Sequence, residues 1–86
     1  MKTFEDLEFK GDDIKRAILY FPNGYGISII YGSYTYSDNG TYAVGILKDN
    51  YLYYETPLAD NILGYQTPEQ INKIIEELSG YKKDQY

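Results

Sequence analysis

The 86-residue chain contains no cysteine, no histidine and no tryptophan. Without cysteine it has neither a disulfide nor a thiolate nucleophile, and without histidine it lacks the usual imidazole base and zinc ligand. Its serines therefore have no histidine to activate them. These absences exclude most familiar catalytic centres, and we expect no enzymatic activity, no metal and no cofactor.

Other motifs that carry chemistry are incomplete. The glycines of "GYGISIIYG" lead into a β-rich run rather than a helix, and the lysine and hydroxyl of a phosphate-binding loop are missing. Adjacent acids such as Asp12 and Asp13 point apart on a regular element, which argues against shared acid–base work. The segment "YSDNGTY" lacks the regular run of oxygen ligands and the closing glutamate of a calcium loop.

Long apolar runs are also absent. No stretch approaches the ~20 apolar residues that span a bilayer, and "MKTFEDLEFK" lacks the apolar run of a signal peptide. Thirteen acidic residues against eight basic ones give a net charge of −5, which disfavours direct binding to nucleic acid or anionic lipid. We therefore expect a cytosolic protein that binds neither nucleic acid nor membranes.

The composition that is present is that of a folded protein, because 43% of the residues are apolar and 24% are charged. The chain shows no repeat and no internal linker. We predict a single α+β domain over residues 1–80 and a frayed C-terminal tail, "YKKDQY", over residues 81–86.

Two β-rich runs on either side of Pro22-Asn23-Gly24 predict a first hairpin, with Gly24 in the left-handed conformation that closes a three-residue loop. This loop sets the register. One face then carries Ala17, Leu19, Phe21, Tyr25, Ile27 and Ile29 and is the expected core, whereas the other carries Arg16, Ile18, Tyr20, Gly26, Ser28 and Ile30.

A second hairpin is predicted in "TYAVGILKDNYLYYET", with Lys48-Asp49-Asn50 as the turn and Leu47 opposite Tyr51. Tyr42, Val44, Ile46, Leu52 and Tyr54 would share one face. The opposite face would carry Ala43, Gly45, Leu47, Tyr51 and Tyr53. Because its large rings stand beside small residues, we expect this second face to be partly open, or covered by the amino-terminal segment or a dimer partner.

The segment "TPEQINKIIEELSG" predicts a helix, with Thr67 as N-cap, Pro68 at the first helical position, Gln70 in the capping box and Gly80 just past the end. Ile71, Ile74, Ile75 and Leu78 form one apolar stripe that must dock on the sheet.

Two segments give weaker signals. Residues 56–66 are too punctuated for a strand and are expected to make a turn or short helix that anchors Leu58, Ile62 and Leu63. A strand over residues 4–10 would turn Phe4, Leu7 and Phe9 inward. The predicted fold is therefore α+β: an antiparallel β-meander of four to five strands with one C-terminal α-helix packed on one face.

Tyrosine dominates the aromatic residues, with twelve tyrosines against three phenylalanines. Its polar tip and apolar body suit a half-wet position, and the mixture of Tyr, Ser, Gly, Asn and Asp in "YGSYTYSDNGTY" is typical of recognition loops. We predict a partner-binding surface formed by Tyr31, Tyr34, Tyr36, Asp38, Asn39, Tyr51 and Tyr53. The alternative is structural: Tyr31 and Tyr42 pack on the core while Tyr34 and Tyr36 cover a sheet edge.

Three stretches, "FPNGYGISII", "GSYTYSDNGTYAVGIL" and "ETPLADNILGYQTPEQINKII", resemble a group of small uncharacterised proteins encoded in tailed-phage and prophage genomes. That group shares an NGYG-type hairpin, a Tyr/Gly-rich loop and a "TP-D-I-GY-T--E" segment before a terminal helix. Ala43 stands here where the group often has an acidic residue. The resemblance covers residues 21–78 and implies a phage or mobile-element origin, not a reaction.

The expected function is non-enzymatic protein–protein binding in the host cytosol, as a stoichiometric inhibitor of a bacterial defence protein in the manner of an anti-CRISPR factor. The partner would be a host or phage protein, and a homodimer through the open sheet face is an alternative. Two other functions stay open: a sponge for a small ligand or nucleotide signal, and a phage accessory or assembly protein.

Overall fold

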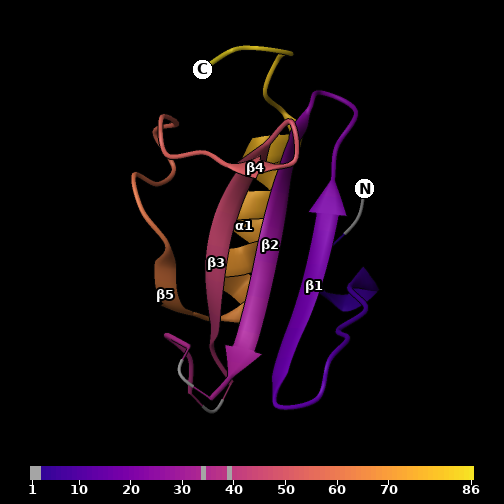
Figure 1. Ribbon diagram of the computed structural model, residues 1–86. Helices are drawn as coiled ribbons and strands as arrows, with labels where there is room; N and C mark the ends of the chain where they lie inside the picture. Colours follow the sequence, from indigo (N-terminus) through magenta and orange to yellow (C-terminus); the bar gives the residue numbers. More distant parts are fainter. Residues whose placement is uncertain (1–2, 34, 39) are drawn as a thin grey trace.

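The computed structural model describes residues 3–33, 35–38 and 40–86 and shows an antiparallel sheet with one helix behind it (Figure 1). Strands β1 (Ile14–Tyr20), β2 (Tyr25–Gly32) and β3 (Tyr42–Lys48) form the meander, and β4 (Tyr51–Leu52) and β5 (Leu63–Gln66) both pair with β3. The predicted α+β architecture is confirmed.

The first hairpin has the predicted register, since Ala17 pairs with Ile29 and Leu19 with Ile27. Gly24 adopts a φ of 88°, as a left-handed turn residue must. The inner face of this hairpin forms the core of the sheet. Tyr25, Ile27 and Ile29 are fully buried there.

The predicted register of the second hairpin is wrong by one residue. Leu47 pairs with Leu52 and Lys48 with Tyr51, so that Asp49 and Asn50 alone make the turn, with φ values of 52° and 74°. A two-residue turn with both residues left-handed matches the twist of the strands better than the three-residue turn we expected.

The one-residue slip reverses the faces of β4 and the residue after it. Leu52 lies on the outer face over Gly45, and Tyr53 instead packs against the core. The outer face of β3 is therefore not open as predicted: Ala43 and Leu47 are buried, and Leu52 and Ile62 lie over Gly45 between them.

Residues 63–66 form a strand, which contradicts the prediction that this segment makes only a turn or short helix. Leu63 pairs with Val44 and Gln66 with Tyr42, across an irregularity that adds a residue to β5. The predicted anchoring is confirmed for Leu58 and Leu63, which both pack against the core.

The predicted N-terminal strand is not formed. Phe4–Asp6 is a 3₁₀-helix, η1, and only Lys10 makes a bridge to β1, at Arg16. The inward direction of the apolar residues is confirmed, since Phe4, Leu7 and Phe9 pack against the core. The Phe4 amide donates to Asn72 Oδ1 at 2.7 Å, so this segment lies on the helix side of the sheet and leaves the outer face uncovered.

Helix α1 (Pro68–Ser79) has the predicted capping box, in which the Gln70 amide donates to Thr67 Oγ1 at 3.2 Å and the Thr67 amide donates to Gln70 Oε1 at 2.8 Å. Its predicted apolar stripe is buried on the inner face of the sheet: Ile71, Ile74, Ile75 and Leu78. Gly80 ends the helix with a φ of −87°, a conformation that any residue can adopt.

Residues 81–86, which the sequence predicts to be frayed, make specific contacts. Tyr81 is buried against the Tyr25 ring, with ring centres 5.3 Å apart. The Tyr86 amide donates to the Tyr25 hydroxyl at 2.9 Å, and Lys48 Nζ donates to the main-chain oxygen of Tyr86 at 2.7 Å.

Candidate functional site: the outer face of the sheet

The structure separates the residues that the sequence predicts to bind a partner. Tyr31 lies on the inner side, in edge contact with Phe9 and Tyr42 at ring distances of 5.4 and 5.3 Å. This is the structural alternative considered for Tyr31. Tyr53 also faces inward, with the Lys48 ammonium 4.9 Å from its ring centre.

The other predicted residues lie at the surface. Tyr51 is 77% exposed and Tyr36 is 65% exposed, and Asp38 is exposed while accepting a hydrogen bond from the Thr41 hydroxyl at 2.6 Å. Tyr34 and Asn39 lie outside the described residues. Tyr36 and Tyr51 sit on different elements, so the predicted residues do not form one continuous surface.

A groove on the outer face brings together exposed side chains from β1 and β4. We call it the outer groove; it has a volume of about 550 Å³. Its lining consists of Arg16, Ile18, Tyr20, Ser28, Leu47, Asn50, Tyr51 and Leu52. Strand β1 supplies one wall and the β3–β4 hairpin the other, because β2 between them carries only small or short side chains at these positions.

Two glycines shape the walls of the outer groove. A side chain at Gly26 would stand 2.8 Å from the Tyr20 ring, and one at Gly45 would stand 2.7 Å from Leu52. The Tyr20 ring and the Leu52 side chain can therefore pack directly on the backbone of the sheet, because neither glycine has a side chain. This packing makes the outer face shallow and apolar rather than ridged.

The walls of the outer groove remain accessible to solvent. Ile18, Tyr20 and Leu52 are each about half exposed, at 46%, 50% and 51%. Single exposed apolar residues are normal on a protein surface, but a cluster of them marks an interaction site. Ile18 and Tyr20 were assigned to this face from the sequence, whereas the wrong register placed Leu52 inside.

Arg16 is the one charged side chain in the lining of the outer groove. In the described part of the chain, the ion pair found is Lys48 with Asp84, at 3.6 Å, and no acidic partner of Arg16 is found. A guanidinium beside tyrosines and aliphatic side chains is well suited to a bidentate contact with a carboxylate.

Lys48, by contrast, is already engaged on the inner side. Its ammonium lies 5.7 Å from the centre of the Tyr25 ring as well as over Tyr53. Partial burial would lower the pKa of Lys48, but the phenol groups of Tyr53 and Tyr25 and the Asp84 carboxylate outweigh it and raise that pKa above its ordinary value. Lys48 therefore serves as a structural cation.

A second pair of exposed aromatic residues lies at the opposite edge of the sheet and consists of Tyr36, which was predicted to bind a partner, and Tyr65, which was not. The Tyr65 amide donates to the Tyr36 main-chain oxygen at 2.8 Å, and the Tyr36 side chain lies against Gly64. Tyr65 has a φ of 55°, which is unusual for a tyrosine, and is 55% exposed. The irregularity in β5 turns this ring outward.

The groups in the outer groove favour recognition over chemistry. They comprise one guanidinium, two phenols, a serine hydroxyl and an amide among aliphatic side chains. Across residues 3–33, 35–38 and 40–86, no three acidic side chains gather in a way that could hold a metal ion. The same residues include no helix that is long and apolar enough to cross a membrane.

Comparison of the chain with protein-family models, with curated proteins and with solved structures gives no match. The resemblance to phage-encoded proteins therefore stays a prediction.

Proposed function

We propose that this protein acts without catalysis, by binding another protein through the outer face of its sheet. One observation carries the proposal: Ile18, Tyr20 and Leu52 are exposed around Arg16, while α1 and the described N-terminal residues pack on the inner face. Tyrosine and arginine are the residue types most often found at the energetic centre of protein interfaces.

The lining of the outer groove indicates the chemistry of the partner surface. An apolar projection would fill the space between Tyr20 and Leu52, and a carboxylate would pair with Arg16. The resemblance supports the narrower proposal that the partner is a bacterial defence protein which this chain inhibits stoichiometrically in the host cytosol. A second copy of the chain is the alternative partner for the exposed residues of the outer groove.

A second candidate function is the binding of a small anionic ligand. Its support is the size of the outer groove, about 550 Å³, which falls within the range of small-molecule sites, together with two phenol rings and a cation. A nucleotide would stack on a tyrosine ring and place a phosphate at Arg16. Because Arg16 is the one cation in the lining, a ligand with several phosphates fits poorly.

Affinity capture with matched variants tests the proposal. The tagged protein is used to recover partners from bacterial lysate, in parallel with a small-molecule extraction. The test variant is Tyr20→Ala, and the control is Tyr54→Ala, which removes a 40% exposed tyrosine outside the groove. A partner identified by mass spectrometry is then titrated against each variant.

We expect Tyr20→Ala to weaken partner binding by roughly thirtyfold, as the loss of an interface anchor does, and Tyr54→Ala to bind like the wild type. Equal binding by both variants would exclude the outer groove as the interface. Recovery of a small molecule that Arg16→Gln no longer retains would favour the second candidate. A dimer in light scattering that Tyr20→Ala dissociates would identify a second copy as the partner.

A further inference from the structure

We propose that the free edge of β1 binds an extended segment of a partner protein by strand addition, and that a basic side chain of this segment pairs with Glu8. The inference rests on the proposed function and adds the mode of binding and the chemistry of the bound segment. It uses main-chain groups at the edge of the sheet, which are distinct from the side chains of the outer groove.

The direction of the β1 main chain follows from its observed hydrogen bonds. Arg16 exchanges two hydrogen bonds with Lys10, each 2.9 Å long, so its main-chain groups point away from β2. These groups alternate along an antiparallel strand, and those of Ile18 and Tyr20 therefore point outward too. In the described part of the chain, no other segment donates to or accepts from them.

The chain itself shows that this edge accepts an antiparallel strand, because Lys10 already pairs there. The N-terminal segment leaves the edge after one bridge, since Phe9 turns inward and stacks on Tyr42 with ring centres 5.5 Å apart. The outward main-chain groups of Ile18 and Tyr20 are therefore left unpaired by the described N-terminal residues at the place where a longer strand would continue. Such an edge is a template for another chain.

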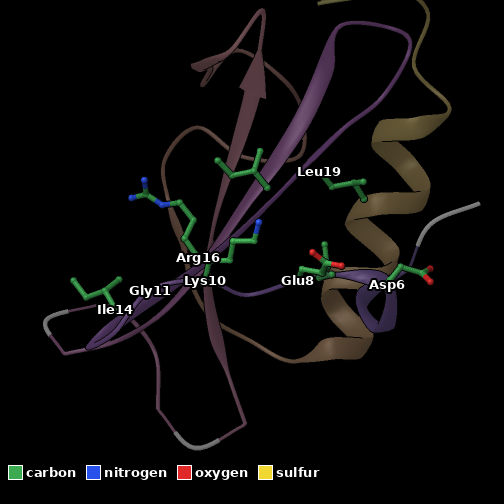
Figure 2. A pocket seen from close by; sticks show the side chains of 9 residues that line it. Asp6, Glu8, Lys10, Gly11, Ile14, Arg16 and Leu19 are labelled. Atoms are coloured by element: carbon green, nitrogen blue, oxygen red, sulfur yellow. The ribbon is translucent and has the colours of Figure 1, made fainter.

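A second groove opens at this place, between the N-terminal segment and β1; we call it the edge groove (Figure 2). It has a volume of about 970 Å³. Asp6, Leu7 and Glu8 line one side and Ile18 and Leu19 the other, and Lys10 and Arg16 line the end where the N-terminal segment pairs with β1. The space is therefore large enough for side chains of an added strand.

The geometry of an antiparallel strand added to β1 specifies which of its side chains would fill the edge groove. Residues opposite Ile18 and Tyr20 would extend the apolar outer face, whereas the residue opposite Leu19 would point into the edge groove. Asp6 is engaged with the Thr3 amide, at 2.9 Å, but no partner of the Glu8 carboxylate is found among the described residues. The matching segment is apolar–basic–apolar.

A second copy of the chain fits this edge less well than such a segment. Two β1 strands paired about Leu19 would place Leu19 opposite its own copy and offer no cation to Glu8. Arg16, already paired with Lys10, would face Pro22, which has no amide hydrogen. The net charge of −5 on each copy adds repulsion.

The test uses a synthetic peptide, acetyl-Thr-Val-Lys-Val-Thr-amide, added to the ¹⁵N-labelled full chain. We expect the amide signals of Ile18 and Tyr20 to shift and to become protected from hydrogen exchange. The amides of Ala17 and Leu19, which already face β2, should change less. N-methylation of the two valines should abolish binding, whereas N-methylation of the lysine, whose amide points away from β1, should not.

Side-chain pairing is tested with Glu8→Gln, against Glu5→Gln as a control outside the edge groove. We expect Glu8→Gln to weaken peptide binding by up to about fivefold, the upper end for an exposed ion pair, and Glu5→Gln to have no effect. Replacing the peptide lysine with glutamate should weaken binding at least as much.

Three results would overturn the inference: no amide shift at millimolar peptide, equal binding of the valine-methylated peptide, or shifts of Ile18 and Tyr20 that depend on protein concentration alone. The last would show that a second copy occupies the edge. None of these measurements uses a variant of the Tyr20 side chain, so the inference can fail while the outer groove remains the interface, and the reverse also holds.

Discussion

Tyr81 joins the helix to the tail, and its ring is buried against Tyr25. Burial raises the pKa of its phenol well above the ordinary value of 10.0, and the hydrogen bond from its hydroxyl to Glu77 Oε2, 3.0 Å long, raises it further. The neutral phenol is thus favoured in the folded state. In the unfolded state it loses its proton at the ordinary pKa.

This difference predicts a loss of stability at alkaline pH. The contribution of Tyr81 is fully present below about pH 10 and is lost as the pH rises above that value, because only the unfolded state then releases the proton. We expect the Tm of the wild type to fall between about pH 9 and about pH 11, and that of Tyr81→Phe to fall less. Parallel pH profiles of the two proteins would argue against a perturbed Tyr81.

At the scale of single residues, the sequence could not separate the roles of the tyrosines. Tyr25 is fully buried with its hydroxyl paired to Tyr86, whereas Tyr51 is 77% exposed. Both stand in alternating β-rich runs next to turn residues. Their exposure depends on the register and on which face the helix covers, and neither is a property of the residue itself. Arg16 was assigned to the outer face, but its position between two groups of exposed side chains required the structure.

Helix α1 allows a direct comparison of its two ends. Thr67→Ala should lower the free energy of unfolding by ~1 kcal/mol, because it removes the acceptor of the Gln70 amide. Gly80→Ala should cost clearly less, since Gly80 has a negative φ and an added Cβ would meet carbonyl oxygens at ordinary contact distances of 3.5 and 3.6 Å.

Urea denaturation of both variants measures the two costs. A larger loss for Gly80→Ala than for Thr67→Ala would mean that the helix ends in a left-handed conformation in solution.

At the scale of elements, local signals were sufficient for the helix and the first hairpin. Thr67, Pro68 and Gln70 mark the start of the helix within four residues. The left-handed conformation at residue 24 favours the glycine that stands there. The second hairpin was ambiguous because both Asp49 and Asn50 tolerate a positive φ, so two-residue and three-residue turns were both consistent with the sequence. Packing of Tyr53 on the core distinguishes them.

Strand β5 shows the other limit of local patterns. Its four residues include Gly64, and Tyr65 has a positive φ, so it lacks the alternation that identifies a strand. It becomes a strand because β3 has a free edge at Tyr42 and Val44. Tyr42 and Val44 lie some twenty positions before β5 in the chain. The sequence around residues 63–66 therefore cannot indicate that this edge is available.

In the whole molecule, Asn23 connects the tip of the first hairpin to the end of the helix. Its side-chain amide donates to the main-chain oxygens of Leu78 and Tyr81, at 2.8 and 2.9 Å, and its Oδ1 accepts from the Tyr25 amide at 3.0 Å. We expect Asn23→Ala to lower the free energy of unfolding by ~2 kcal/mol, because three partly buried hydrogen bonds are lost together.

Asn23→Asp serves as the matched variant. It keeps the acceptor for the Tyr25 amide but cannot donate to Leu78 and Tyr81, so its free energy of unfolding should lie between those of the wild type and Asn23→Ala. Chemical denaturation at neutral pH measures the series. If both variants unfold like the wild type, the link between hairpin and helix contributes nothing to stability.

The position of α1 after all five strands has a consequence for synthesis of the protein. Ile27, Ile29, Val44 and Ile46 belong to strands that can pair within microseconds of leaving the ribosome. Part of the cover of their inner face comes from the helix residues Ile71, Ile74, Ile75 and Leu78, which are translated later. At ~5–20 residues per second, the intervening segment takes on the order of seconds to translate. During this interval the inner face of the nascent sheet lacks the cover of α1, and its exposed apolar side chains are available for aggregation and for binding by chaperones.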